Sequence, residues 1–319
     1  MQRYLLRRFL FSLFAIWATV TLTFVFVRAL PGDPITTMVG SEGDPAAIAG
    51  IKARLGLDEP VPIQYLYFLR SVAKLDFGDS IYLRLPVVDQ IKTALPRSIS
   101  LALISFILAV AIGIPAGIIS ATRRYTIWDH AATLIAFTGL AMPSFWLGII
   151  LIIVFGVVLN LLPVFGYFPL FDSSGIHFWP WFSHLILPAL ATGTGSAAIL
   201  ARQTRSAMLE TLSQDYIRTA YAKGLSGRVV IWRHAFRNSL IPVITVMGII
   251  LALLLNGVVI TENVFAIKGL GRLLVDSILG RDYPIVQGVI LLTAILFIFA
   301  NFVVDILYAF INPRIRYTD

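Results

Sequence analysis

Long stretches without a single charged residue constrain this chain more than any other feature. Phe9–Val27 and Ser98–Thr122 are two clear examples, each about as long as the hydrocarbon core of a bilayer requires of a helix. Helices satisfy their own backbone hydrogen bonds, so apolar runs of this length predict membrane spans. Four more runs follow, in Ala131–Phe171, Leu185–Ala201, Ser239–Thr261 and Tyr283–Val304.

Composition supports the same class of protein. Of 319 residues, 58% are hydrophobic and 13% are charged, which is more apolar surface than a soluble domain of this size can bury. We therefore expect an all-α polytopic membrane protein with six transmembrane helices. The chain has no cysteine, which excludes disulfides, thiolate metal sites and cysteine nucleophiles. The net charge of +8 comes largely from basic residues beside the spans, so it indicates topology rather than nucleic-acid binding.

The ends of the spans follow from charge and proline. The N-terminal run resembles a signal peptide, but it is long and no A-x-A pattern follows before Pro31, so we interpret it as a retained span. We expect the third span to end near Asn160, where Leu162-Pro163 breaks it. The rest of this stretch, to about His184, is expected to be an aromatic interfacial segment with Trp179 and Trp181. Pro188 and Pro242 are expected to open the fourth and fifth spans.

The chain divides into three parts on this interpretation. Residues 1–30 form the first span, 31–96 a small folded insert, and 97–319 a core of five spans that includes the polar loop 210–242. Within the insert, Asp44 to Gly56 has helix signals, with Ile48, Ile51 and Leu55 on one face, and a second helix from about Pro62 carries Ile63, Leu66, Leu69 and Val72. A further short helix is expected in Val264–Pro284, with Leu270, Leu273, Leu274 and Ile278 on one face and Gly280 at its end.

Positive charge sets the orientation. Both termini, the short Arg123-Arg124 loop and the region Arg202–Arg237 hold 14 of the 25 Lys and Arg residues. Short loops rich in Lys and Arg stay in the cytoplasm. Both termini and the loop 210–242 are therefore expected to be cytoplasmic.

The loop 210–242 shows the signals of a short helix. Ser213 is a candidate N-cap, Asp215 lies in the first turn, Lys223 in the last, and Gly224 stands where a left-handed residue ends a helix. Its apolar residues recur at helical spacing, and an exposed apolar face on such a helix predicts a protein partner. This face consists of Tyr216, Ile217, Ala220 and Tyr221. Ser226 is expected to cap a second helix that runs to about Asn238.

The stretch 215–225, DYIRTAYAKGL, resembles the "EAA" loop of ABC-importer permeases, and within them the dipeptide/oligopeptide branch. Arg218 and Thr219 stand where the wider family has Glu and Ala. Other pieces resemble the same family in the same order: Leu30–Pro34, Leu55–Asp58, Asp76–Ser80, Gly269–Leu274, Arg281–Pro284 and Asn312–Tyr317.

The resemblance implies a permease with a type I importer fold, a second homologous permease chain, two ATPase subunits and an extracytoplasmic solute-binding protein. It places the chain in the inner membrane of a prokaryote, with ATP and Mg on the ATPase subunits and no cofactor in this chain. Peptides are the implied cargo, while relatives also carry nickel complexes, glutathione or oligosaccharides. The implied ATPase-coupling residues are Asp215, Tyr216, Ile217, Arg218, Thr219, Ala220, Tyr221, Lys223, Gly224 and Leu225.

Catalytic patterns are missing from the sequence. It has no G-x-x-x-x-G-K-[ST], and its four histidines have no metal-ligand spacing. Gly193-x-Gly195-x-x-Ala198 predicts a small-residue face for close helix packing rather than a dinucleotide site.

The expected membrane spans are almost free of ionisable groups, and Glu262 is expected near water, so a proton-coupled carrier is the weaker alternative. Polar residues that either line a neutral path or pack between helices are Thr192, Thr194, Ser196, Thr245 and Asn256.

Overall fold

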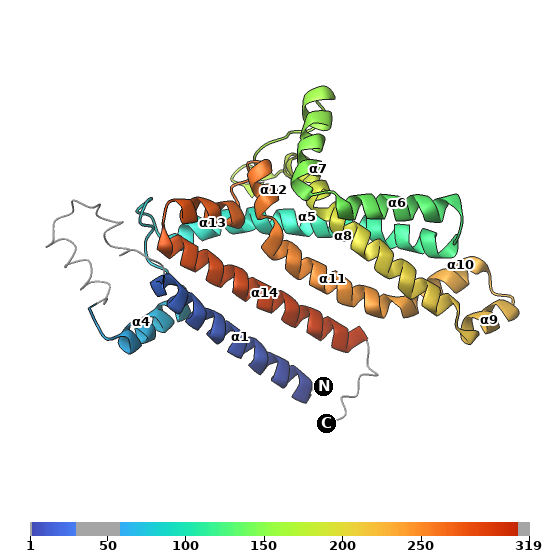
Figure 1. The fold of residues 1–319 in the computed structure, drawn as a ribbon, viewed down its shortest axis with the longest axis horizontal. Coiled ribbons are helices and arrows are strands. Elements are labelled where there is room, and N and C mark those ends of the chain that lie inside the picture. The colour runs from blue at the N-terminus through green and yellow to red at the C-terminus, as the bar shows by residue number, and fades with distance from the viewer. Residues whose placement is uncertain (1, 30–57, 312–319) are drawn as a thin grey trace.

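The computed structural model describes residues 2–29 and 58–311, and this part of the chain is a bundle of helices. Long helices lie side by side along the longest dimension of the molecule, and shorter ones lie at its two ends and off the middle of one side (Figure 1). The membrane-length helices are α1 (Gln2–Ala29), α5 (Val87–Thr122), α8 (Phe178–Leu212), α11 (Arg237–Gly257) and α14 (Tyr283–Ile311). The shorter helices are α4 (Val61–Ala73), α6 (Ile127–Ala141), α7 (Ser144–Leu151), α9 (Asp215–Ala222), α10 (Gly227–Val229), α12 (Val259–Val264) and α13 (Leu270–Leu279), with π-helical turns η1 (Ile152–Val158) and η2 (Val230–Phe236).

Five helices of the described chain are long and apolar enough to cross a membrane, and a sixth span is formed by a bent pair. The six-span prediction is confirmed on this basis. The third span is not a straight helix ending near Asn160, because α6 and the helical run Ser144–Val158 meet at an angle of 105°. Pro143 causes the break, since the residue before a proline avoids the helical region, and Met142 is extended with φ −85° and ψ 122°.

Three prolines lie inside helices that were expected to start at or after them. Pro96 is within α5, so residues 87–96 of the expected insert are helical. Pro188 is within α8, and Pro242 is within a continuous helical run from Gly227 to Gly257. In a membrane, neighbouring helices and local π-type turns accommodate the hydrogen bond that an interior proline removes, so proline marks a helix start less reliably there.

Helices α5 and α8 pack with their backbones close together. A Cβ atom added at Gly117 would lie 2.6 Å from the carbonyl oxygen of Ala201. On α8, a Cβ atom at Gly193 would lie 2.7 Å from the carbonyl oxygen of Ser105. Gly195 instead faces α6, with Gly139 O at 3.8 Å as its nearest neighbour. The small-residue prediction is therefore confirmed for Gly193, and the two glycines face different helices.

The segments between the first two spans fold onto the ends of the long helices. The first helix expected in the insert lies outside the described residues, and the second is α4, which begins at Val61 as its proline signal indicates. Helix α4 contacts α1 through Tyr65 and Phe68, whose rings pack against that of Phe24. Leu66 remains 62% exposed.

Two sequence motifs far apart in the chain meet at this end. Asp282 is buried and accepts a hydrogen bond from the hydroxyl of Ser80. The backbone N–H groups of Ile81 and Tyr82 also donate to its carboxylate, each at 3.2 Å. The Asp76–Ser80 and Arg281–Pro284 motifs thus form one joint between the loop before α5 and the start of α14.

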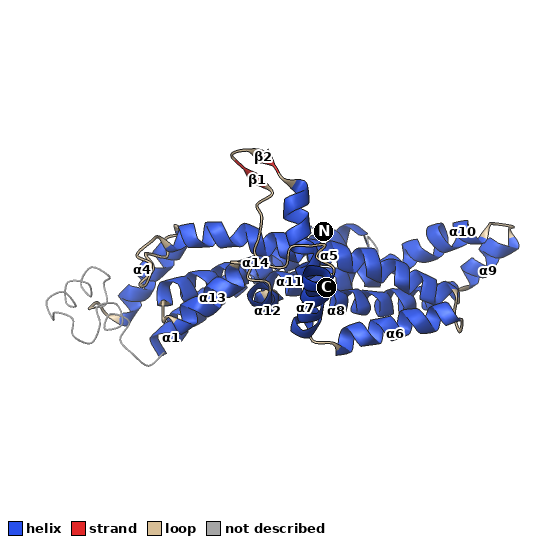
Figure 2. Cartoon of the chain, turned by 90° about the horizontal axis from the view of Figure 1, so that it is seen from above, coloured by secondary structure: helices blue, strands red, loops and turns tan. Residues whose placement is uncertain are grey.

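A short antiparallel hairpin, β1 (Phe171–Asp172) and β2 (Gly175–Ile176), stands off the helices in the segment before α8 (Figure 2). Asp172 there accepts hydrogen bonds from Ser174 and contacts His177 Nε2 at 3.1 Å. The expected aromatic segment is therefore partly a folded hairpin.

Candidate functional site

Helix α9 lies at the end of the molecule opposite α4 and α13 (Figure 1). It begins one residue later than its cap signal implied. Ser213 is not its N-cap, because Ser213 ends α8 and its hydroxyl donates to Glu210 O at 2.8 Å. Gln214 precedes α9 without a side-chain cap, while Asp215 lies in the first turn, where a negative charge suits the helix dipole.

Gly224 ends α9 in the way its position in the sequence predicts. Its φ is +77°, a backbone conformation that side chains with a Cβ atom rarely adopt. Its N–H donates to Tyr221 O at 2.9 Å, and the N–H of Leu225 donates to Ala220 O at 3.4 Å. These two bonds are the pair that defines a Schellman motif, so the chain turns sharply here and leads into α10.

The apolar face of α9 is divided between the chain itself and its surface. Ile217 and Ala220 are buried, at 2% and 7% exposed, so they are not part of an exposed face. They pack in one apolar cluster with residues of α5, α8 and η2: Ile118, Ala121, Met208, Val230 and Ala235. This cluster, the α9 seat, fixes α9 to the ends of two long helices because apolar area is removed from water on both sides.

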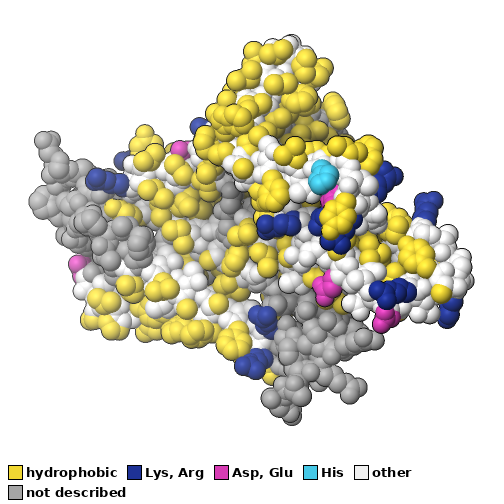
Figure 3. Space-filling model, turned by 45° about the vertical axis from the view of Figure 1, so that its right-hand side comes forward, with side chains coloured by type: hydrophobic (Ala, Val, Ile, Leu, Met, Phe, Trp, Pro, Cys, Tyr) yellow, Lys and Arg dark blue, Asp and Glu magenta, His cyan; other side chains and the backbone are white. Residues whose placement is uncertain are grey.

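The outward side of α9 is aromatic and basic. Tyr216 and Tyr221 are 42% and 49% exposed, and Tyr216 Oη accepts a hydrogen bond from Asn238 Nδ2 at 2.8 Å. Arg218 forms an exposed i,i+3 ion pair with Asp215 at 3.5 Å. Figure 3 shows Lys and Arg side chains around apolar ones at this end of the molecule. The candidate coupling surface consists of these exposed residues together with Thr219, Lys223, Leu225, Arg228 and Trp232, which are also exposed.

The second helix of the loop is not separate from the fifth span. Ser226 precedes α10 as expected, although its side chain makes no capping bond, and η2 then continues into α11. The α9 seat is therefore joined to α11 by unbroken helix, because η2 contributes Val230 and Ala235 to it.

The four predicted path residues whose side chains are described do not converge within this chain. Thr192 donates to Thr261 Oγ1 on α12 at 2.8 Å, which is helix packing, while Thr194 faces Gly139 on α6. Ser196 is half-buried on α8. Thr245 is exposed on α11 and donates to Ile241 O. Asn256 belongs to α11, but its side chain lies outside the described part.

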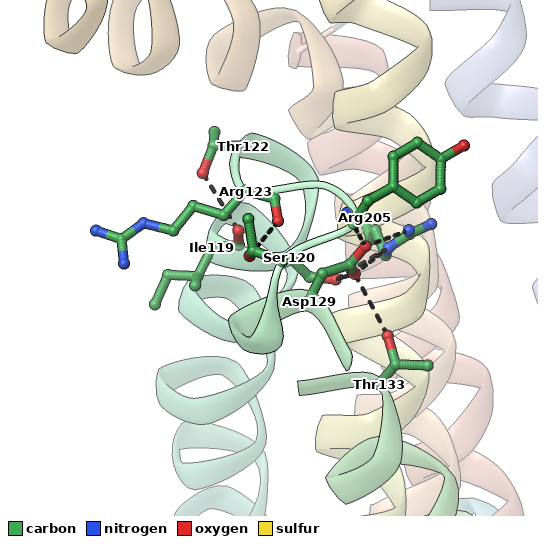
Figure 4. Close-up of polar contacts among 9 residues, drawn as sticks. Ile119, Ser120, Thr122, Arg123, Asp129, Thr133 and Arg205 are labelled. Carbon is green, nitrogen blue, oxygen red and sulfur yellow. Dashed lines mark hydrogen bonds and ion pairs between the residues drawn. The ribbon is translucent and has the colours of Figure 1, made fainter. Parts of the chain in front are cut away.

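Sequence reasoning missed an ion pair within the helices. Asp129 on α6 is 3% exposed and pairs with Arg205 on α8, whose Nη2 lies 2.9 Å from Asp129 Oδ2 (Figure 4). Both residues fall just outside the uncharged runs, so each was counted as part of a polar loop. The available signal was a single acidic residue beside the basic Arg123-Arg124 turn.

Glu262 is the second correction, because it is fully buried rather than near water. It lies in α12, beyond the fifth candidate span, which ends at Leu255. Its carboxylate accepts from Ser98 Oγ at 2.6 Å and from the N–H of Arg272 at 2.9 Å, at the start of α13. A Cβ atom at Gly269 would lie 2.2 Å from Glu262 Oε1, which explains why the Gly269–Leu274 motif begins with glycine.

Replacing Glu262 is expected to loosen α13. Glu262→Ala leaves buried donors without an acceptor, at a cost of about 1–3 kcal/mol for each. Hydrogen exchange in Leu270–Leu279 should therefore accelerate in this variant relative to the parent chain.

The same carboxyl predicts a pH dependence. Burial raises the pKa of Glu262 above its ordinary value of 4.5. Its contribution to stability is therefore fully present below 4.5 and is lost as pH rises through the raised pKa. Glu262→Gln stays uncharged, so exchange in α13 should rise less steeply with pH in this variant than in the parent. Identical pH profiles in the two proteins would contradict the assignment.

Comparison with known proteins identifies the family. Residues 113–317 match the family model described as binding-protein-dependent transport system inner membrane component, and residues 1–102 match the N-terminal model of that system. The chain therefore belongs to this family of importer permeases.

The particular relatives are peptide permeases by name. The chain is 41% identical to the dipeptide transport system permease protein DppB of Escherichia coli (strain K12), over 99% of both chains. It is 44% identical to a putative peptide transport system permease protein of Brucella abortus (strain 2308), over 93% of both. Among solved structures, an inward-facing MetNI methionine ABC transporter matches with a TM-score of 0.56 and 17% identity, covering 70% of this chain and 97% of that one. The last likeness supports the type I importer fold.

Proposed function

We propose that this chain is one permease subunit of an ATP-driven importer for di- or oligopeptides. Its family and the names of relatives that match over nearly the whole chain support this cargo. The importer would hold a second homologous permease, two ATPase subunits and an extracytoplasmic solute-binding protein. ATP and Mg would be bound by the ATPase subunits, since this chain has no phosphate-binding loop.

The observation that carries the coupling role is the construction of α9. Ile217 and Ala220 seat the helix on α5, α8 and η2, while Tyr216 and Tyr221 face outward from the same short helix. A helix fixed on one side and exposed on the other transmits force from a docked partner to the spans. Closure of the ATPase dimer would push α9 as a rigid body, and the spans would rock between inward- and outward-open states.

The orientation proposal places α9 in the cytoplasm of a prokaryote, with the chain in the inner membrane. The start of α1, the end of α14 and the turn between α5 and α6 point toward the same end of the bundle as α9 (Figure 1). This arrangement supports the positive-charge argument for two cytoplasmic termini.

Docking of the ATPase provides the test. Tyr221→Ala removes an exposed aromatic anchor, so ATPase affinity should fall about tenfold or more, which corresponds to about 1.4 kcal/mol. Tyr82→Ala is the matched control, because Tyr82 is 80% exposed at the opposite end. Affinity would be measured with purified permease pairs and ATPase in detergent.

The outcomes separate the alternatives. Loss of ATPase binding in Tyr82→Ala but not in Tyr221→Ala would invert the orientation. ATPase binding that is unchanged in both variants would refute the coupling surface, and tight ATP binding by the isolated chain would refute the subunit assignment. Uptake assays with peptides, glutathione, nickel complexes and oligosaccharides would then distinguish the cargo, and uptake independent of the ATPase would favour a secondary transporter.

A further inference from the structure

The carboxylate of Asp129 connects three helices, α5, α6 and α8, through hydrogen bonds (Figure 4). Asp129 on α6 accepts two hydrogen bonds from Arg205 on α8. Arg205 Nε donates to Asp129 Oδ1 at 3.0 Å, and Arg205 Nη2 donates to Asp129 Oδ2 at 2.9 Å. The hydroxyl of Ser120 on α5 and the N–H of Tyr125 also donate to it. A forked arginine bond fixes direction as well as distance, which apolar contacts between helices do not.

The groups that hold Asp129 adjoin the α9 seat. Ser120 directly precedes Ala121, and Arg205 lies three residues before Met208. Ala121 and Met208 both pack with Ile217 of α9. The segments of α5 and α8 that pack against α9 are therefore the same segments that hydrogen-bond to Asp129 of α6.

Helix α6 runs from the Asp129–Arg205 pair to the bend in the third span. A cavity of about 380 Å³ lies between α5, α6 and α8 beside the ion pair, with Gly117, Phe137 and Ala198 in its lining, so these helices are not fully packed against one another there. Beyond the 105° bend at Met142 and Pro143, Gly148 of α7 packs against Phe265, which is buried next to α12.

We propose that Asp129 and Arg205 are positioning residues for transport, which make α6 follow α5 and α8 when α9 moves, so that the motion reaches α7 through the bend. This inference rests on the coupling role proposed for α9. It assigns the pair a part in converting ATP hydrolysis into transport, in addition to any part in folding.

The first test compares uptake with ATP hydrolysis in the complete importer reconstituted in vesicles. Asp129→Asn leaves one hydrogen-bonding oxygen but removes the charge and the fork. We expect ATP hydrolysis within about twofold of the parent and transport per ATP at least about tenfold lower, as loss of a charge-assisted pair permits. Asp89→Asn is the matched control, because Asp89 forms an exposed pair with Lys92 at the outer end, and it should behave as the parent.

The second test measures the motion itself. Because the chain has no cysteine, spin labels can be placed at Ile127→Cys and Ser206→Cys, two exposed positions on α6 and α8. With Asp129 intact, the distance between the labels should be the same with and without ATP. In Asp129→Asn the distance should change or broaden when ATP is added.

Each outcome decides between the proposals. Normal transport per ATP in Asp129→Asn, or a label distance that is unaffected by this variant, would overturn the inference. Failure of Asp129→Asn to accumulate or assemble would assign the pair to folding alone and would also overturn it. Failure of the coupling proposal is seen separately, as normal uptake in a Gly224→Val importer with Asp129 intact.

Discussion

Gly224→Val is expected to leave the chain in the membrane at near-normal amounts and to abolish substrate uptake. Gly224 has a φ of +77°, and a β-branched residue in that conformation costs on the order of 1–2 kcal/mol. This cost is too small to prevent insertion of the apolar spans. It is large enough to open the Schellman turn, tilt the exposed side of α9 and misplace it relative to the ATPase.

The chain supplies a matched control for this prediction. Gly227 lies three residues further along, it is not among the glycines with positive φ, and a Cβ atom there meets nothing within 4 Å. Gly227→Val should therefore retain uptake and ATPase binding. Uptake at parental levels in Gly224→Val, measured with peptide in whole cells, would refute the coupling role of α9.

Gly193→Ala is expected to lower the amount of folded chain more than any surface change. The added methyl group would lie 2.7 Å from the carbonyl oxygen of Ser105, so α8 and α5 must separate along their contact. Overpacking of this kind costs about 1–3 kcal/mol. Thermal unfolding in detergent and protein yield would both report the loss.

Gly195→Ala is the control for this change because it alters the same motif two residues away. Its nearest neighbour, Gly139 O, would be 3.8 Å from the new Cβ atom, which is an ordinary contact. Alanine also favours helix over glycine by about 0.5–1 kcal/mol, so this variant should be as stable as the parent or more so. Equal loss of stability in both variants would contradict the packing argument.

For the third span, the sequence correctly predicted that a proline interrupts the helix, but the prediction chose the wrong proline. The uncharged run indicated a membrane span, and its hydropathy was sufficient for that. The expected break at Leu162-Pro163 lies beyond the helix, which ends at Val158, whereas the decisive proline is Pro143. Four other prolines of the described chain, Pro96, Pro115, Pro188 and Pro242, lie inside helices, so proline alone did not distinguish a bend from a tolerated interior position.

The α9 residues show where an amphipathic pattern stops being informative. Tyr216, Ile217, Ala220 and Tyr221 share helical spacing, which correctly predicts a helix with an apolar side. The pattern contains no information about which of them meets the chain's own α5 and α8. Only the packed structure decides that Ile217 and Ala220 are covered while the two tyrosines remain available.

The sequence by itself determined the membrane class, the short helix in the polar loop 210–242 and its glycine end. These depend on local properties, namely the hydropathy of about twenty successive residues and the φ preference of one. Tertiary structure alone decided the partners of the buried charges. Asp129 meets Arg205 across 76 residues and Asp282 meets Ser80 across 202, while Glu262 is enclosed by the start of α13. A carboxylate is stable away from water only where donors converge on it, and that convergence is set by how helices distant in sequence pack.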